Sequence, residues 1–301
     1  MTRYLDPKID VLFKMKFRTE LTIDPYPFQL HHNHFIMLIG SCFSEHIGQF
    51  LLRGGFPVLS NPFGTLFNPL SIANGLRMSI SPECFSENYI YQHENRWVSF
   101  AHHGKFSKLT REELITHVKT ELDQSHQFLQ KADFLFLTFG TAFYYVFKSR
   151  ELLVANCHKI PAKEFEKKRA TIDNIIAEYR ELFQKLKTFN PKLKIVFTVS
   201  PIRHLGDGFH ENQISKSILH VAVEELLACD ECYYFPSYEL LLDDLRDYRF
   251  FAHDLCHPSS SAIEYICEKF MQAFFSIETI ERRNQAEKEA KAKEHISNYF
   301  G

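Results

Sequence analysis

The sequence of 301 residues lacks features that would point to two classes of partner. It has no apolar segment that approaches the length of about 20 residues needed to cross a bilayer. It also lacks an excess of charge, because 35 Lys and Arg stand against 37 Asp and Glu, which leaves a net charge of −2. So weak a field does not attract nucleic acid or an anionic membrane surface. We therefore expect neither a nucleic-acid partner nor a membrane partner.

Cysteine is sparse, with seven residues scattered along the chain. An odd number of cysteines in a large chain is typical of reduced thiols in a cytosolic protein. Cys229 and Cys232 form a single CxxC pair, and no second pair follows at the spacing of a zinc site. The first 17 residues mix charges into their apolar side chains, unlike the core of a secretory signal. We expect a cytoplasmic protein with no metal and no cofactor.

What is present is a set of short, nearly continuous apolar runs, which predict strands buried on both faces. These runs are 35–40, 134–140, 194–200 and 232–237. Amphipathic stretches that predict helices lie around and between them, at 43–52, 111–130, 167–188 and 213–228. Strands that alternate with helices indicate an α/β fold with a parallel sheet.

Parallel sheets bind ligands at the carboxyl ends of their strands. We therefore expect four segments to lie along one edge of the fold: Ser41, Gly140–Thr141, Ser200–Arg203 and Pro236–Ser237. Residues 55–108 are rich in loop-forming residues and are expected to form a long insertion after the first helix, and such loops are usually functional. Residues 277–301 are expected to form a charged peripheral helix.

Two side chains that can act as nucleophiles, Ser41 and Cys42, follow the first apolar run. Serine at this position is also a favourable helix N-cap, so capping is the plain alternative to catalysis. Cys42 lies one residue into the helix, where a cysteine behaves as a small apolar side chain. The start of the helix offers backbone N–H groups that could stabilise an oxyanion.

A second chemical feature is the pair Asp254 and His257, three residues apart and directly before Pro258. The serine run that follows is expected to cap a helix, with Ser261 and Glu264 at capping-box spacing. On the turn before that helix, the carboxylate can fix the imidazole tautomer while the other ring nitrogen accepts a proton from a nucleophile. His257 alone could be a hydrogen-bonded structural histidine, but its acidic partner favours a general base.

Six segments in one order resemble the GSCFA family, part of the wider SGNH or GDSL-like hydrolase group. They are GSCFSEHIG (40–48), NPFGTLFNP (61–69), LTFGTAFYY (137–145), VANCHKIP (154–161), SPIRHLGDGFHENQISKS (200–217) and DLCHPS (254–259). The resemblance covers roughly residues 15–275. It implies a three-layer α/β/α sandwich with a flavodoxin-like parallel sheet, forming one hydrolase domain over 15–276.

The resemblance also implies site roles. Ser41 is similar to the nucleophile, with Asp254 and His257 as the other triad members, and Gly64 is similar to the oxyanion glycine that acts beside the Ser41 N–H. The wider group carries Gly-x-Asn after its third strand, whereas this chain has Gly140-Thr141-Ala142. The side-chain oxyanion donor is therefore expected to be Thr141, at a strand end, or Asn156.

Two further residues are candidates for substrate contact. Arg203 follows a strand end, where a guanidinium suits a carboxylate, a phosphate or sugar hydroxyls, although a salt-bridged loop is the alternative. His103 lies in the 55–108 insertion and either lines the pocket or is structural. Residues 1–14 resemble the opening of PD-(D/E)XK transposase-type nucleases; we interpret them as a fused or mis-started leader and assign them no function.

Three functions remain open at this point. The first is an ester hydrolase that cleaves a small acyl ester, for example an O-acetylated carbohydrate, through a Ser-His-Asp acyl-enzyme. The second is an O-acyltransferase that uses the same acyl-enzyme, with residues 55–108 as a lid that excludes water. The third is a non-catalytic carbohydrate-binding protein on a hydrolase fold. The absence of the Gly-x-Asn asparagine favours this interpretation, whereas the presence of Ser41, Asp254 and His257 argues against it.

Overall fold

The computed structural model describes residues 18–300, with side chains to residue 292, so the predicted leader at 1–14 lies outside the described residues. A five-stranded sheet forms its centre. The strands are β1 (Ile36–Gly40), β2 (Val58–Ser60), β5 (Phe134–Phe139), β9 (Lys194–Val199) and β10 (Cys232–Tyr234). They are parallel and lie in the order β10-β9-β5-β1-β2. Counted along the chain this is the order 2-1-3-4-5 of flavodoxin-like folds, which confirms the predicted fold class.

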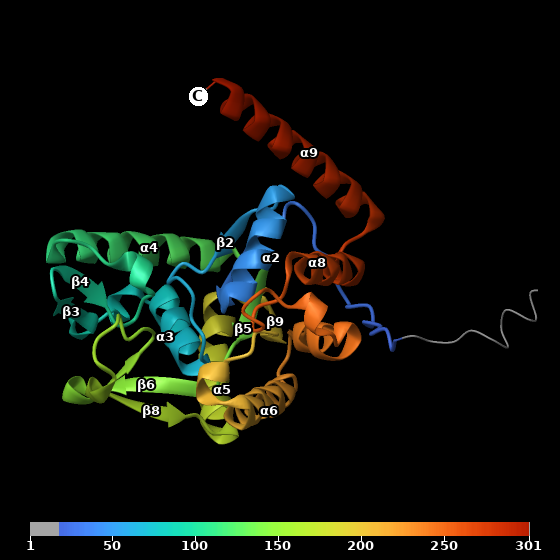
Figure 1. Ribbon diagram of the computed structural model, residues 1–301. Coiled ribbons are helices and arrows are strands. Elements are labelled where there is room, and N and C mark those ends of the chain that lie inside the picture. Colours follow the sequence, from blue (N-terminus) through green and yellow to red (C-terminus); the bar gives the residue numbers. More distant parts are fainter. Residues whose placement is uncertain (1–17, 301) are drawn as a thin grey trace, which may run out of the picture.

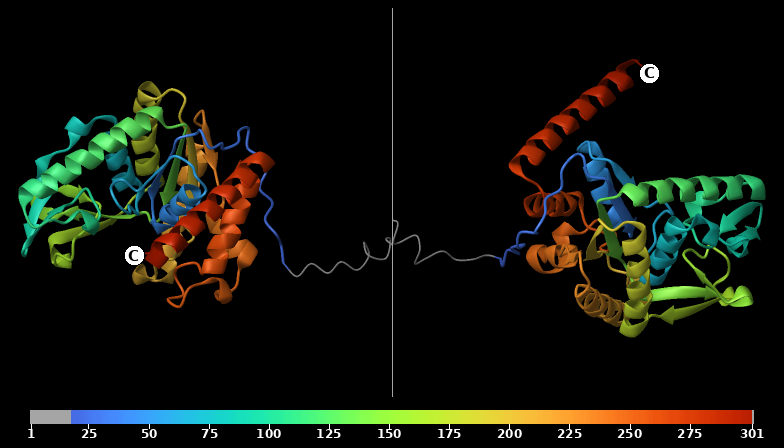
Figure 2. Two further views of the ribbon diagram at one scale, coloured as in Figure 1. Left: turned by 90° about the horizontal axis from the view of Figure 1, so that it is seen from above. Right: turned by 180° about the vertical axis from the view of Figure 1, so that it is seen from behind.

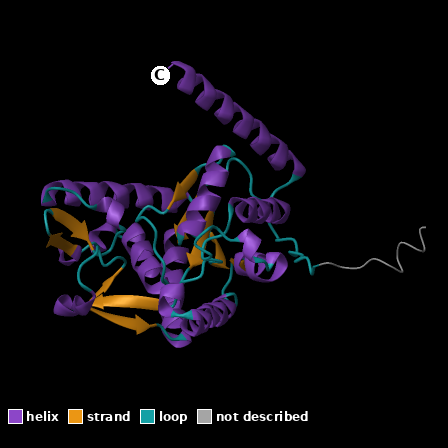
Figure 3. Cartoon of the chain, viewed as in Figure 1, coloured by secondary structure: helices purple, strands orange, loops and turns teal. Residues whose placement is uncertain are grey.

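Helices cover both faces of the sheet, so the molecule has three layers (Figures 1 and 3). Successive strand residues face opposite sides: Met37 and Ile39 enter one apolar cluster, while Ile36 and Leu38 enter the other. The first cluster contains the buried sides of α3 (Pro69–Ile80), α4 (Arg111–Lys131), α5 (Ile172–Phe189) and α6 (Phe209–Leu226). The second contains those of α2 (Cys42–Arg53) and α8 (Ser260–Phe274).

Capping residues set where the helices begin. Thr171 caps α5 in a capping box with Asn174, so this helix starts at residue 172 and not at the predicted 167. The residues before it form β8 (Phe165–Arg169) instead. At α8 the cap is Ser259, whose hydroxyl accepts from the Ala262 N–H at 3.3 Å, and not the predicted Ser261.

Residues 55–108 are more regular than the sequence suggests. They supply β2 to the central sheet, the buried helix α3, and a hairpin of β3 (Ile90–His93) and β4 (Arg96–Ser99). A small antiparallel sheet follows later in the chain, in which β6 (Phe143–Phe147) pairs with β7 (Leu152–Val154) and with β8. A mainly aromatic cluster of side chains joins the two small sheets. Both sheets lie on the side of the molecule away from α8 (Figure 1).

The charged helix predicted at the C-terminus is α9 (Ile277–Phe300), which extends away from the central sheet (Figures 1 and 2). Near its start the Arg283 guanidinium lies 4.3 Å from the centre of the Phe50 ring on α2. Arg283 also pairs with Glu287 at 2.6 Å, one helical turn along. Within residues 18–300, none of the helices combines the length and the apolar character needed to cross a bilayer.

Candidate active site

The carboxyl ends of the central strands bring the chemical segments together. Gly40 of β1 pairs with Thr138 of β5, and Phe139 of β5 pairs with Val199 of β9. The residues that follow these strands therefore emerge side by side at one edge of the sheet. This is the arrangement that the sequence predicts for Ser41, Gly140–Thr141 and Ser200–Arg203.

Ser41 occupies the tight connection between β1 and α2. A Cβ on the preceding Gly40 would lie 2.3 Å from the Thr138 carbonyl oxygen, so only glycine lets the two chains approach this closely. Ser41 is fully buried and is the N-cap of α2. Its Oγ accepts a hydrogen bond from the Phe43 N–H at 3.3 Å, which is long enough to be weak.

Cys42, the rival nucleophile, is poorly prepared to attack. Burial raises the pKa of its thiol, and the carboxylate of Glu45 raises it further. Because the thiolate is the reactive form of cysteine, a raised pKa lowers its reactivity at neutral pH. Of the two adjacent side chains, Ser41 is therefore the better candidate, since an external base can activate a hydroxyl.

Asp254 and His257 are joined as the sequence predicts. The Nδ1 atom of His257 lies 2.5 Å from Oδ2 of Asp254. The other carboxylate oxygen accepts backbone N–H groups from His257 at 3.0 Å and Cys256 at 2.9 Å. These N–H groups, followed by the imidazole, hold the pKa of Asp254 well below its usual range. An ionised Asp254 keeps the proton of a neutral His257 on Nδ1 and leaves Nε2 free to accept one.

Arg203 braces the loop that carries this pair. Its backbone N–H donates to the Cys256 carbonyl at 3.3 Å, and its guanidinium donates to the Leu255 carbonyl. The guanidinium also stacks over the Phe251 ring, 4.5 Å from the ring centre. Leu255 itself has a φ of +57°, a left-handed conformation that a leucine adopts only under constraint. The structure thus directs Arg203 to the Asp254–His257 loop, whereas the sequence suggested substrate contact.

The loop faces the start of α2, although His257 and Ser41 are not bonded. Among the hydrogen bonds of residues 18–292, none joins Ser41 Oγ to His257. Burial lowers the pKa of His46, in the second turn of α2, and the nearby charge of His257 lowers it further. Burial also lowers the pKa of His204, at the end of β9, to about 4, with Lys216 and His257 contributing. His257 therefore lies near His46 of α2 and near His204 of the loop after β9.

The two backbone groups expected to bind an oxyanion are both engaged in this structure. The Gly64 N–H donates to the Asn61 carbonyl at 2.8 Å, and the Ser41 N–H donates to the Thr138 carbonyl at a long 3.4 Å. Gly64 has a φ of +73°, and a Cβ there would lie 2.3 Å from the Cβ of His103. The glycine is therefore required by the turn and by close packing.

The side chains expected near the oxyanion are engaged elsewhere. Thr141 Oγ1 lies 3.1 Å from Ser215 Oγ and accepts from the Phe143 N–H at 3.1 Å. Asn156 Oδ1 accepts from the His158 N–H at 2.7 Å. The structure shows neither side chain in a hydrogen bond with Ser41. His103 Nδ1 accepts from the Lys105 N–H at 3.3 Å, which places its ring in a local turn beside Gly64.

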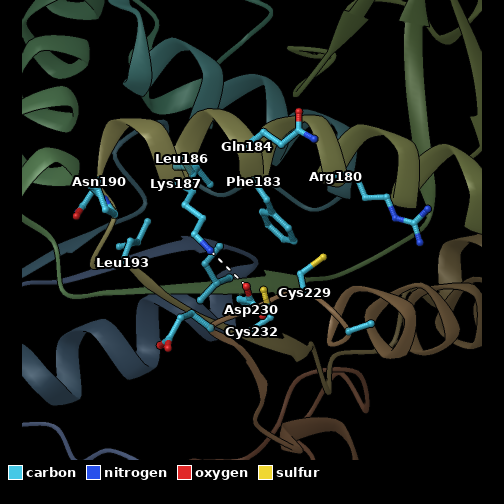
Figure 4. A pocket seen from close by; sticks show the side chains of 14 residues that line it. Arg180, Phe183, Gln184, Leu186, Lys187, Asn190, Leu193, Cys229, Asp230 and Cys232 are labelled. Carbon is cyan, nitrogen blue, oxygen red and sulfur yellow. Dashed lines mark hydrogen bonds and ion pairs between the residues drawn. The ribbon is translucent and has the colours of Figure 1, made fainter.

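A cavity of about 280 Å³ opens at this same edge, between the central sheet and the small sheet of β6. Thr141 and His204 line it from the loops after the strands, and Phe143, Tyr145 and Asp207 are among the other lining residues. Ser41, Asp254 and His257 do not line this cavity. A different cavity of about 420 Å³ lies at the amino ends of β9 and β10 and is lined by the CxxC cysteines (Figure 4).

Within the described residues, no three His, Cys, Asp or Glu side chains are grouped as metal ligands would be.

Sequence reasoning missed Lys216, which projects from α6 beneath the site. It is 1% exposed, and its Nζ donates to the carbonyls of Gly140 at 2.6 Å and Ser200 at 2.7 Å. The amine thus ties together the loops that follow β5 and β9. Burial lowers the pKa of Lys216 to about 7. Only the fold could reveal this role, because a lysine on a helix is usually solvated.

We expect Lys216 to make stability depend on pH. Between about pH 7 and 9 the unfolded chain keeps this proton and the folded chain releases it, so the free energy of unfolding rises with pH. The slope from this one group is up to about 1.4 kcal/mol per pH unit. Urea unfolding of the wild type and Lys216→Met at pH 6, 7, 8 and 9 measures it. The wild type should gain stability relative to the variant above pH 7; a constant difference would show that Lys216 keeps its charge state.

Comparison with known proteins gives one family match. The model of the GSCFA family matches residues 35–270. No curated protein matches the chain.

Among solved structures, a carbohydrate esterase family 3 protein from Talaromyces cellulolyticus is 11% identical, with 78% of this chain and 93% of that chain covered and a TM-score of 0.36. A mutant acetyl-xylooligosaccharide esterase from Geobacillus stearmophilus is 13% identical, with coverage of 82% and 96% and a TM-score of 0.38. An acetyl xylan esterase from Butyrivibrio proteoclasticus is 10% identical, with coverage of 80% and 63% and a TM-score of 0.39.

Proposed function

The chain belongs to the GSCFA family, and from this premise we propose that it is a serine ester hydrolase with Ser41, His257 and Asp254 as its triad. The observation that carries the proposal is the Asp254–His257 pair, held by three hydrogen bonds on a loop that lies near His46 of α2, the helix capped by Ser41. Acyl transfer needs a serine that can reach an imidazole held by a carboxylate, and Ser41 and His257 are our candidates for these two roles.

In the proposed reaction Ser41 Oγ attacks the acyl carbonyl carbon while Nε2 of His257 takes the hydroxyl proton. The imidazolium, stabilised by Asp254, then returns that proton to the departing alcohol as the ester C–O bond breaks. Water attacks the resulting acyl-enzyme, with His257 again accepting the proton. Release of the carboxylic acid restores Ser41.

The resting structure is closed, and catalysis requires a local rearrangement. Ser41 is fully buried, so a substrate reaches Oγ only after a covering segment moves. The weak cap bond to the Phe43 N–H must also break so that Oγ can turn toward His257. Breaking it frees a backbone donor at the positive end of α2, where it favours developing negative charge.

For the substrate we propose a small acyl ester, with an O-acetylated carbohydrate as the first to test. The cavity of about 280 Å³ supports this choice. Its wall combines the rings of Phe143 and Tyr145 with the carboxylate of Asp207. Aromatic faces and a few polar groups are the usual means of holding a compact ligand with hydroxyl groups.

An O-acyltransferase is the second candidate, and the buried nucleophile is the observation that favours it. A closed site excludes water, so the acyl-enzyme can wait for an acceptor alcohol. The two candidates share every step up to the acyl-enzyme. Acid release in buffer alone indicates the hydrolase, whereas turnover that needs a sugar acceptor and yields a new ester indicates the transferase.

We expect a fluorophosphonate probe to modify Ser41, because the probe reacts with serines activated by a neighbouring base. Mass mapping of the labelled protein identifies the modified residue, and heat-unfolded protein is the control. In parallel, release of acid from p-nitrophenyl acetate and from an acetylated xylo-oligosaccharide measures turnover. The absence of both adduct and turnover would refute the enzyme proposal and favour a carbohydrate-binding protein.

A further inference from the structure

Asn61, directly after β2, carries a buried amide nitrogen with no hydrogen-bond partner. The residue is 3% exposed, and its Nδ2 atom makes no hydrogen bond within the part of the chain that the structure describes. The Oδ1 atom of the same amide accepts from the Gly40 N–H at 2.9 Å, next to Ser41 in the chain. Buried amide donors are nearly always paired, so an unpaired one beside a candidate nucleophile requires an explanation.

The orientation of this amide is determined by its surroundings. Rotating it by half a turn would place the NH₂ group against the Gly40 N–H, two donors facing each other, so Oδ1 must lie on that side. The backbone N–H of Asn61 donates to the Leu38 carbonyl at 2.8 Å, as the last step of the parallel ladder between β1 and β2. At Asn61 the backbone adopts a φ of +47°, which ends the ladder. The Asn61 side-chain oxygen, in place of a backbone carbonyl of β2, then accepts the N–H of Gly40 in β1.

The same bond places Nδ2 close to the Gly40–Ser41 connection. Nδ2 and Oδ1 are attached to one planar amide carbon, and Oδ1 accepts from the N–H of Gly40, the residue directly before Ser41. The left-handed backbone of Asn61, unusual for a residue with a side chain, holds the amide in that position.

We propose that Asn61 Nδ2 is the side-chain donor that binds the oxyanion formed when Ser41 attacks an acyl carbonyl. This inference rests on the proposed function. It places the side-chain oxyanion donor at the end of β2. In the wider group that the chain resembles, this donor is an Asn after the third strand, a position that Ala142 occupies here. Thr141 Oγ1 is engaged with Ser215 and the Phe143 N–H, and Asn156 Oδ1 accepts from the His158 N–H. Asn61 Nδ2, by contrast, is buried beside Gly40 without a hydrogen bond among the described residues.

The decisive variant is Asn61→Asp, assayed at pH 8, well above the usual pKa of an aspartate. It preserves the acceptor for the Gly40 N–H and replaces only the donor. We expect kcat to fall by about 10²- to 10³-fold, while KM changes only a few-fold, because the lost interaction forms in the transition state. If Asn61 merely secures Gly40, the variant keeps its kcat, and that result would overturn the proposal.

Asn190→Asp is the matched control. Asn190 is also 3% exposed, but it lies at the opposite end of the sheet (Figure 4). Its amide donates to the carbonyls of Leu129 and Ala132. This variant buries the same new carboxylate and should lose stability while kcat stays within about two-fold, since the hydrogen-bond donors around Ser41 are untouched. A comparable fall in kcat for Asn190→Asp would mean that the Asn61 result reports general destabilisation.

A measurement on the wild type keeps the test valid even if Asn61→Asp does not fold. After a phosphonate probe has modified Ser41, its tetrahedral oxygen mimics the oxyanion, and the Nδ2 protons of Asn61 should shift downfield in the NMR spectrum. An adduct without that shift would overturn the role of Asn61 and leave the proposed function standing. If the wild type takes no adduct and shows no turnover, the proposed function fails first and this inference fails with it.

Discussion

Ser41→Ala should abolish acyl-ester turnover, with kcat falling by about 10⁴- to 10⁶-fold. Alanine removes the atom that forms the acyl-enzyme and leaves Asp254 and His257 in place. The substitution also removes the N-cap of α2, which costs about 1 kcal/mol of stability and does not unfold a domain of this size. Ester hydrolysis under saturating substrate, together with a thermal unfolding curve, separates the two effects.

Cys42→Ala is the matched control for this prediction. Cys42 is the adjacent residue, and burial raises the pKa of its thiol, so its removal should leave most of the activity. If Cys42→Ala is inactive and Ser41→Ala is active, the assignment of the nucleophile is wrong. Loss of the fluorophosphonate adduct in Ser41→Ala, and its retention in Cys42→Ala, provides a second readout that does not depend on the choice of ester.

The parts of the fold that could be predicted from sequence are those governed by local patterns. The continuous apolar runs before Gly40 and Gly140 identify strands that the structure buries on both faces. The spacing of Asp254 and His257 within one turn lets their hydrogen bond be anticipated from three residues alone. The parallel order of the strands then brings the residues at their ends to one edge.

The rest depends on contacts between segments far apart in the sequence. The role of Asn61 arises from a hydrogen bond to Gly40, 21 residues away, and from a left-handed backbone that no local motif announces. Lys216 can donate to the carbonyls of both loops only because α6 packs beneath the segments that follow β5 and β9. The sequence leaves Arg203 between substrate contact and a role within its loop, and the Leu255 carbonyl to which it donates lies 52 residues further along the chain. Sequence patterns show which residues can do chemistry, and the fold decides which partners they have.

His257→Ala should reduce turnover by about 10⁴- to 10⁶-fold, because it removes the base that we propose accepts the proton of Ser41 as the carbonyl is attacked. The side chain is about half exposed, at 49%, so its removal leaves a gap that opens to solvent. Free imidazole should therefore enter and restore part of the activity of His257→Ala. It should not restore Ser41→Ala, which lacks the nucleophile itself.

Asp254→Asn tests the partner of that histidine without removing it. The amide oxygen can still accept the backbone N–H groups of Cys256 and His257, so the turn is retained. Its NH₂ group, however, faces Nδ1 and favours the tautomer with the proton on Nε2, where a base is needed. We expect kcat to fall by roughly 10³- to 10⁴-fold with little change in the unfolding temperature.

His253→Ala is the control for both variants, because His253 is exposed in the same turn and should be dispensable. Full activity in His257→Ala would remove the general base from the proposal, and with it the reason to regard Ser41 as more than a helix cap. Activity lost equally in His253→Ala and His257→Ala would show that the turn responds to any change, so that neither histidine acts alone. We expect His253→Ala to be active and His257→Ala to be rescued by free imidazole. Free imidazole should not rescue Asp254→Asn, because the His257 side chain still occupies the site, in the wrong tautomer.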